Sequence, residues 1–467
     1  MSWRRRLRYR VPMKWTCLGH AMWLVEAAKI RILFDPLLGA TYHHGAFAPV
    51  PRRDIDITAL KPDVIVVTHR HPDHFDIDSL DRLARQYPGA IILTADVFVG
   101  KVCQRLGFTH VSLLEDWQRL ELEGLSLLTT PSFCAIEEWG MIVATDDGVV
   151  WNQVDTEVSG RTAEVLSRAA AMLERPALAS QLDLVIARWQ PLLQVEAVLG
   201  HATNFPFRRY VREVEQIAAC NARAIIPGAA GSQLANTCWL NAFAYPVSPA
   251  RLARDLARRC PEATVFTARP GAQWQVAGGI VTPIPDCAFV QIVDDTDHRT
   301  FRPLSIPPMD DPDPEGRGTE ALRAVIAPWV QNVMAPRVGA HLFPGGTVNL
   351  CLEVVYPNGE TDTWGIDIGG DRLVLSAGAV DDPDLRNQIA ASELVAVIEG
   401  KAHWGRALLT GRLRSAGTIY TVDETGLEPM KLPPFFLYLA ISYAKATETW
   451  VWGAVSRCLS RRAITPQ

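Results

Sequence analysis

Short apolar runs separated by turn residues fill the first 150 positions of the chain. Trp23–Val25 and Ile30–Phe34 predict two strands, which the polar turn Glu26–Lys29 joins. Val64–Val67 is apolar at every position, and this pattern predicts a strand that is buried on both faces. Four further strands are predicted, the last two of them around the turn Asp146–Gly148: Ala90–Leu93, Ser126–Leu128, Met141–Ala144 and Val149–Trp151.

Helical periodicity alternates with these strands. Asp78–Tyr87 places Leu80, Leu83 and Ala84 on one face, which predicts a helix. Residues 160–176, 207–220 and 249–260 also have a helical pattern, and the apolar strands Leu182–Ala187 and Ala224–Ile226 follow the first two. Strands and helices that alternate in this way predict a layered α/β domain over residues 1–301.

The composition changes at residues 302–318, where Pro and Asp are dense and apolar side chains are few. Such a composition is typical of a linker. Beyond it, the pattern predicts a helix at about 319–334, strands near 347–356, 362–368 and 372–376, and helices at about 383–400 and 434–456. We therefore predict a smaller α+β domain over residues 319–467.

The overall composition is that of a soluble globular protein, with 48% hydrophobic and 21% charged residues and a formal net charge of -5. A mildly acidic chain argues against nucleic-acid binding, which needs a basic domain. The first segment is the exception, because it contains Arg4, Arg5, Arg6, Arg8 and Arg10. We interpret it as the solvated end of a first strand, with peripheral contact to acidic lipid or to an acidic partner as the alternative.

The remaining global features concern location. No apolar stretch is long enough for a transmembrane helix, and no apolar region follows the basic start as in a signal peptide. The nine cysteines are scattered, odd in number and never in a Cys-x-x-Cys pair, which argues against a disulfide framework or a local iron–sulfur motif. We therefore expect reduced thiols in a cytoplasmic protein.

Candidate chemistry is concentrated directly after the buried strand at 64–67, in the pattern His-x-His-x-Asp-His. In a tightly turning loop, His69 and His71 project to one side, and Asp73 and His74 return toward the same point where the helix starts. Three imidazoles and a carboxylate within six residues suit a borderline metal ion such as Zn(II) or Fe(II).

This motif resembles that of the metallo-β-lactamase superfamily. Two other landmarks of the family are present in order, Leu18-Gly19-His20 and Leu33-Phe34-Asp35-Pro36, and both look most like the lactonase- and phospholipase-D-like branch. The resemblance covers roughly residues 15–300 and implies a four-layer αββα sandwich.

The same resemblance implies a set of ligands. His69 and His71 would bind a first metal, Asp73 and His74 a second, and Asp155 would bridge the two. Asp73 and His20 are the catalytic candidates. His20 is expected close to the metals, where it would support a ligand or contact the substrate, with packing in the core as the alternative.

Two departures from the family pattern concern missing imidazoles. Hydrolases of the family usually carry a histidine in a Thr-Pro-Gly-His turn, where this chain has Thr130-Pro131-Ser132-Phe133, and another in a late Gly-His-Gly turn, where it has Pro227–Gly231. The candidates to complete the metal shell are Glu137, Glu138, His20 and His201. We include His201 among the predicted ligands, with a capping or surface role as its alternative, and we expect both glutamates to be solvated.

The segment Ala224–Gly231 also resembles the branch that contains CMP-N-acetylneuraminate hydroxylase. Members of that branch join this fold to a Rieske domain and perform iron-dependent hydroxylation. This chain has no Cys-x-His and Cys-x-x-His pair, so it carries no Rieske domain and electrons would come from a separate donor.

The C-terminal segment resembles the sterol-carrier-protein-2-like fold. Ser392–Gly400 predicts a helix that ends in Gly-Lys, and Ala407–Leu413 leads into a strand through Gly-Arg-Leu. The resemblance implies an apolar tunnel closed by a last helix, here Pro434–Ala440 through Trp450 and Trp452. An ordinary amphipathic helix packed on a sheet is the alternative.

Three functions are compatible with these features. The first is a non-haem iron oxygenase with one or two Fe ions, acting on a small or acyl-type substrate. The second is a zinc or dinuclear-metal hydrolase of an ester, lactone, phosphodiester or sulfate. The third is a lipid- or carrier-binding protein with a vestigial metal site. The two missing imidazoles favour the first.

Overall fold

The computed structural model describes residues 12–43, 45–133, 137–158, 160–200, 205–235, 238–301, 306–334, 347–369, 372–378, 380–381, 383–417, 420–423, 426–429 and 443–464. The arginine-rich start, His201 and the segment Pro434–Ala440 lie outside these ranges. Within them, no helix combines the length and the apolar character that crossing a bilayer requires.

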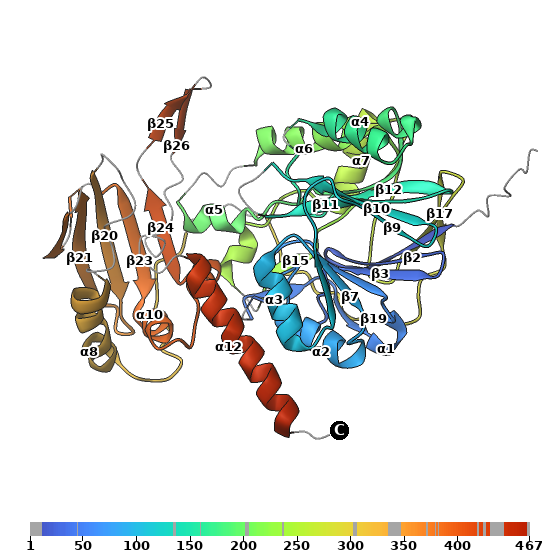
Figure 1. Ribbon diagram of the computed structural model, residues 1–467. Coiled ribbons are helices and arrows are strands. Elements are labelled where there is room, and N and C mark those ends of the chain that lie inside the picture. The colour runs from blue at the N-terminus through green and yellow to red at the C-terminus, as the bar shows by residue number, and fades with distance from the viewer. Residues whose placement is uncertain are drawn as a thin grey trace, which may run out of the picture.

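Two sheets face each other in the first domain (Figure 1). The first sheet has the strand order β18-β17-β1-β2-β3-β6-β7-β8 and the second β16-β14-β13-β12-β11-β10-β9. The strands of the first are β1 (Met13–Gly19), β2 (Met22–Ala27), β3 (Ile30–Phe34), β6 (Val64–Val67), β7 (Ile91–Thr94), β8 (His110–Leu113), β17 (Gln273–Ala277) and β18 (Ile280–Ile284). Those of the second are β9 (Arg119–Leu122), β10 (Leu125–Pro131), β11 (Trp139–Thr145), β12 (Gly148–Asn152), β13 (Leu182–Ala187), β14 (Ala222–Pro227) and β16 (Thr264–Val265).

Helices cover the outer faces of both sheets. α2 (Ile77–Gln86) and α3 (Val97–Leu106) pack on the first sheet, and α4 (Thr162–Met172), α6 (Phe207–Ala219) and α7 (Pro249–Arg259) pack on the second. The space between the sheets is filled by apolar side chains of both, including the buried indoles of Trp15, Trp23, Trp139 and Trp274. The predicted four-layer αββα sandwich is confirmed.

The strand β6 explains how this fold positions the site. It pairs in parallel with β3 and with β7, so it lies inside the sheet and is buried along its whole length. α2 follows shortly after it, and the carboxylate of Asp76 caps the helix by accepting a hydrogen bond from Ser79 N at 2.9 Å. The residues between the strand and the helix are therefore held at both ends.

α3 was not among the predicted helices. It begins with Val97-Phe98-Val99, and β-branched and aromatic residues favour a strand locally. Its ends carry the missed signals, because Asp96 caps the first turn and Gly107, at φ 108°, ends the last.

The second domain is built on a five-stranded sheet of order β22-β21-β20-β23-β24. Its strands are β20 (Thr347–Val355), β21 (Thr361–Gly369), β22 (Arg372–Ala377), β23 (Leu385–Ala390) and β24 (Leu413–Gly417), and its helices are α8 (Thr319–Trp329), α10 (Ala391–Ile398) and α11 (Trp404–Leu409). The predicted helix at 383–400 is wrong in its first half. Residues 385–390 form β23 because they pair with β20 on one side and β24 on the other.

The Pro- and Asp-rich segment has no helix or strand from residue 306 to residue 318, as its composition predicts. It is nevertheless fixed to the second domain. Asp311 accepts a hydrogen bond from Ser392 N at 2.9 Å, and Arg317 forms a two-pronged ion pair with Glu399 at 2.6 and 2.7 Å. These contacts bind it to the start and the end of α10.

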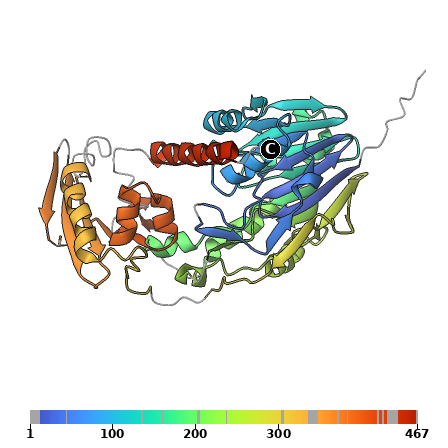
Figure 2. The ribbon, with the colours of Figure 1, turned by 90° about the horizontal axis from the view of Figure 1, so that it is seen from below.

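The last helix, α12 (Tyr443–Ile464), returns to the first domain. Its Val455 and Cys458 belong to the same apolar cluster as the helices α2 and α3, and Arg462 donates to Asp81 at 2.6 Å and to Leu106 O at 2.9 Å. Figures 1 and 2 both show it running from the second domain onto the first. The described part of this helix thus covers the sandwich rather than the second sheet, and the sterol-carrier-like tunnel stays a prediction.

A second contact joins the two domains. Leu409 of α11 belongs to one apolar cluster with Tyr42, Phe47 and Leu240 of the first domain. Gly411 approaches Trp239 so closely that an added Cβ would lie 2.7 Å from the indole nitrogen. The docked second domain therefore lies next to the loops that carry the candidate site.

Candidate metal centre

The loop after β6 gathers the four residues of the histidine motif. His74 N and Phe75 N both donate to His71 O, at 2.9 and 2.8 Å, so the chain turns back on itself before α2 begins. His69 Nε2 and His71 Nδ1 lie 2.7 Å apart, and the rings of His69 and His74 have centroids 4.2 Å apart. The loop therefore converges on one point, as the sequence predicts, with His69 and His74 fully buried.

Asp155 joins this group from the second sheet. It follows β12, and its Oδ2 lies 3.3 Å from His74 Nε2 and 4.0 Å from His69 Nε2. The carboxylate thus lies between the two halves of the histidine motif, where a bridging ligand is needed. Its metal-binding role remains a prediction.

Two buried residues orient the imidazoles. Asp35, at the end of β3, accepts hydrogen bonds from His74 Nδ1 at 3.0 Å and from Thr68 N at 2.9 Å. The Thr68 hydroxyl donates to Asp35 at 3.0 Å, so it can only accept from His69 Nδ1, which lies 3.1 Å away. Both histidines are thereby protonated at Nδ1, so Nε2 is the nitrogen that each can present to a metal.

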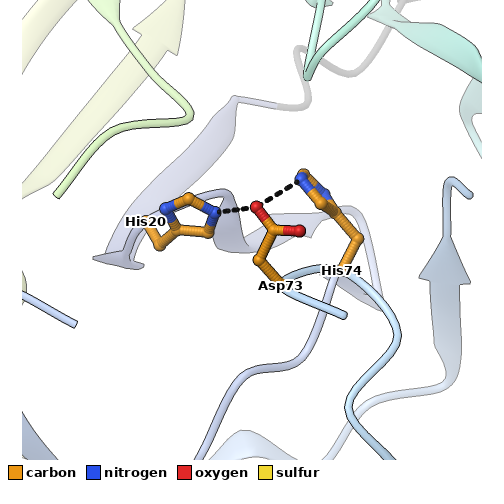
Figure 3. A group of neighbouring side chains, drawn as sticks. All are labelled: His20, Asp73 and His74. Atoms are coloured by element: carbon orange, nitrogen blue, oxygen red, sulfur yellow. Dashed lines mark hydrogen bonds and ion pairs between the residues drawn. The ribbon is translucent and has the colours of Figure 1, made fainter. Parts of the chain in front are cut away.

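His20 approaches from the opposite side of Asp73. Its Nε2 lies 2.9 Å from Asp73 Oδ2, and its Nδ1 lies 3.1 Å from Ser232 Oγ. In Figure 3 the rings of His20 and His74 flank the Asp73 carboxylate. The structure therefore brings both catalytic candidates, Asp73 and His20, into the site.

Glu138 corrects one expectation. The side chain is buried at 7% exposure rather than solvated, and its Oε2 lies 3.9 Å from His69 Nε2. Its other oxygen accepts from Ser132 Oγ at 2.6 Å. The reason is the strand that follows: Trp139 packs in the core between the sheets and draws the preceding residue inward. Glu137 is exposed, as expected.

Different residues stand at the two positions where hydrolases of the family usually carry a histidine and this chain does not. At the first, Glu138 supplies a carboxylate next to His69, whereas Phe133 packs under the guanidinium of Arg161 at 4.4 Å and belongs to the outer cluster near α4. Phe133 is therefore not among the residues that line the cavity over the site. At the second, Ala229, Ala230 and Gly231 line the cavity and bring no imidazole.

A cavity of about 330 Å³ lies over these residues. Its walls include the polar groups His20, His71, Asp73 and Asp155, three arginines (Arg188, Arg209 and Arg299), and the apolar surfaces of Tyr42, Phe47 and Leu409. Leu409 comes from the second domain, so both domains shape the cavity.

The charges in the site favour a bound cation. Burial raises the pKa of Asp73 and of Asp155, but the neighbouring imidazoles together, His74 foremost, lower both by more, so each carboxyl has a pKa below its usual range. Burial and two neighbouring imidazoles lower the pKa of His69, which keeps that ring neutral. Burial lowers the pKa of His74, but Asp73, Asp155 and Asp35 raise it by more, to well above its usual range, so this part of the site favours a positive charge.

The donor atoms fit such an ion. Two groups of ligand atoms each lie within 4.8 Å of one another, His20 with Asp73 and His74, and His69 with His74 and Asp155. His74 Nε2 is buried and makes no hydrogen bond within the described part of the chain. A buried imidazole nitrogen aimed at carboxylates needs a partner, and nitrogen with carboxylate oxygen suits Zn(II) or Fe(II).

Comparison with known proteins gives a family match over residues 14–158, to the model described as "Beta-lactamase superfamily domain". A UPF0173 metal-dependent hydrolase from Methanopyrus kandleri is 24% identical over 159 residues, which cover 32% of this chain and 64% of that protein. A protein of Mycolicibacterium smegmatis, described provisionally as a Rieske 2Fe-2S iron–sulfur protein, is 28% identical over 155 residues, which cover 31% of this chain and 30% of that protein. The chain thus spans less than two thirds of each relative.

Among solved structures, the diiron β-hydroxylase CmlA from Streptomyces venezuelae aligns with a TM-score of 0.39 and 14% identity, covering 57% of this chain and 54% of that one. The family match lies on the strands and loops that hold the histidine motif and Asp155. The first domain, with its two facing sheets and outer helices, has the fold of the metallo-β-lactamase superfamily, and residues 14–158 match the domain model of that family.

Proposed function

We propose that this chain is a metal-dependent oxygenase with a dinuclear non-haem iron centre. The observation that carries the proposal is the buried carboxylate of Glu138, 3.9 Å from His69 Nε2. Two imidazoles and one carboxylate on one metal, with open positions, are the ligand pattern of non-haem Fe(II) oxygenases. We propose that His69, His71 and Glu138 would form that set.

The second half of the centre is also rich in carboxylate. Asp73 and His74 would hold a second ion, and Asp155 would lie between the two. The late turn contributes Ala229, Ala230 and Gly231 to the cavity wall and no side-chain ligand, so an ion held by Asp73 and His74 would be left open to the substrate on this side. Iron bound by these residues would supply oxidation with dioxygen as the co-substrate.

The rest of the site prepares this chemistry. Asp35 and Thr68 fix the tautomers of the two buried histidines. His20 lies beside Asp73 and contacts the cavity, where it can hold or deliver a proton. Leu409 and Phe47 exclude water from one wall of the cavity, which protects a reactive centre from side reactions.

The overall reaction requires an electron donor. Insertion of one oxygen atom into a substrate C–H bond consumes one dioxygen, two electrons and two protons, and yields the hydroxylated product and one water. Because the chain carries no Rieske motif, we propose that a separate protein supplies the two electrons. The relative described as a Rieske iron–sulfur protein supports the link between this fold and electron transfer.

A zinc hydrolase is the alternative. The relative described as a metal-dependent hydrolase favours this alternative. His20 could take the place of one of the missing histidines and help to activate a metal-bound water. The two functions differ in their need for dioxygen. The third candidate, a lipid carrier with a vestigial metal site, depends on the C-terminal resemblance alone and stays a prediction.

The test compares metal content and turnover under two atmospheres. The protein is purified after growth with iron or with zinc. One assay measures oxygen uptake in air with a reductant, and the other measures cleavage of chromogenic lactones and phosphodiesters under argon. We expect iron-dependent oxygen uptake that falls at least tenfold in Glu138→Gln and is unchanged in the matched control Glu137→Gln, because only Glu138 is buried beside His69. Zinc-supported turnover under argon would overturn the proposal in favour of the hydrolase.

A further inference from the structure

A second cavity, of about 490 Å³, lies where the two domains and the last helix meet. The start of α2, the connection between α10 and α11, and α12 each provide part of its wall. It shares Tyr42, His43 and Pro72 with the cavity over the metal site. Tyr42 and His43 therefore line both spaces, at the point where the two cavities adjoin. Figure 2 shows how α12 bridges the domains here.

The wall of this second cavity is predominantly cationic. Five basic side chains reach it from three different segments: Arg70, Lys401, Arg406, Arg457 and Arg461. Among the residues that the structure describes, two acidic side chains line it, Asp76 and Asp78. Asp76 is engaged by Ser79 at the start of α2, and Asp78 lies 3.5 Å from Arg461. The lining therefore carries an excess of positive charge.

Several of these basic side chains form ion pairs with carboxylates that do not line the cavity. Lys401 pairs with Glu399 at 2.9 Å, and Arg406 pairs with Glu393 at 3.1 Å. Arg457 differs, because no ion pair joins it to an acidic group in the part of the chain that the structure describes. Its guanidinium lies over the ring of Trp450, 5.4 Å from the centroid. Stacking of this kind fixes a guanidinium while its N–H groups stay available.

The cationic lining and the stacked guanidinium of Arg457 together indicate an anionic ligand. A stacked guanidinium presents its donors in a plane that matches the oxygens of a phosphate or a carboxylate. Trp450 and Phe75 add apolar surface for the part of the ligand next to its charged group. The metal cavity alone, at about 330 Å³, lies at the lower end of the range for ligand pockets, and the adjoining space extends it.

We propose that this second cavity binds the phosphate or carboxylate at the far end of an elongated substrate whose reactive end lies at the metal centre. The reach to the metal rests on the proposed function, whereas anion binding does not. The substrate is thus held at both ends, by the metal site and by α12. This assigns a role to the return of α12 onto the first domain, since it brings Arg457 and Trp450 into the wall of the cavity that His43 also lines.

The experiment measures binding of phenyl phosphate, and in a second arm of benzoate, to the full-length protein by calorimetry. We expect Arg457→Gln to weaken binding of the preferred probe about tenfold, the effect of one charge-assisted hydrogen bond. Trp450→Leu should weaken it in the same direction, because the guanidinium then loses its support. The matched control Arg258→Gln, on the exposed face of α7, should bind as the wild type. Binding should weaken as salt is added.

One further variant separates this proposal from the proposed function. His69→Ala should lose metal but keep the affinity for the probe, because the anion site lies outside the metal shell. Unchanged affinity in Arg457→Gln, no measurable binding of either probe to the wild type, or loss of binding in His69→Ala alone would each overturn the proposal. A wild-type protein that binds the anion but shows no iron-dependent oxygen uptake would overturn the proposed function and leave the anion site standing.

Discussion

Replacing Asp35 by Asn tests how the fold prepares the metal centre. Asp35 is fully buried and has φ 41°, a backbone region that Asn tolerates well, so the variant should fold. An asparagine oxygen can still accept from Thr68 N, but its NH2 group then faces His74 Nδ1, 3.0 Å away in the native structure. Two donors cannot face each other, so His74 moves its proton to Nε2.

The consequence is specific to metal binding. A proton on Nε2 blocks the lone pair that His74 offers to the metal, and loss of such a supporting contact typically lowers metal affinity by about 10–100-fold, which corresponds to roughly 1.4–2.7 kcal/mol. The assay is competition with a chromophoric chelator, together with thermal unfolding of the metal-free protein. Asp63→Asn, at an exposed carboxylate that accepts from Arg31 N, is the control. Wild-type metal affinity in Asp35→Asn would refute the tautomer assignment.

Three further predictions concern the frame around the site. Arg462→Met removes one of the two arginines that pair with the buried Asp81, the other being Arg85. We expect a loss of about 1–3 kcal/mol in unfolding free energy and faster proteolysis within α12; unchanged proteolysis would contradict the docking of this helix. Gly411→Ala places a Cβ 2.7 Å from the Trp239 indole at a residue with φ 69°, so the melting temperature should fall by several degrees. An unchanged melting temperature would contradict the docking of the two domains. Burial lowers the pKa of His403 to about 4, so the unfolded state binds more protons between pH 4 and 6.5 and stability should rise with pH across that window. In His403→Asn, which keeps a capping side chain, this rise should shrink by about 1–2 kcal/mol; an identical pH profile would contradict the burial of this imidazole.

The local parts of the site could be predicted from the sequence because the chain itself brings them together. His69, His71, Asp73 and His74 lie in one turn between a wholly apolar strand and a capped helix, so their convergence needs no distant partner. Asp155 was found through the family pattern alone, since no local signal shows that the end of β12 reaches the histidine loop.

Other residues could be identified only from tertiary structure. Glu138 is charged and stands beside an equally charged Glu137, and its burial depends on the anchoring of Trp139 between the sheets. Residues 385–390 became a strand because two neighbouring strands pair with them. The docking of α12 on α2 and α3 joins residues more than 350 positions apart, as the contact between Arg462 and Leu106 O shows. The sequence pattern of α12 alone does not indicate that its partners are α2 and α3.

The identity of the metal and the role of Glu138 are tested most directly by anomalous diffraction from crystals of the iron-loaded protein, recorded above and below the iron edge. The account predicts two iron peaks, one within about 2.2 Å of His69 Nε2 and of a Glu138 oxygen, with Asp155 between the two. Only zinc in the site, or a Glu138 carboxylate still turned away toward Ser132 and outside bonding distance of any metal, would contradict it.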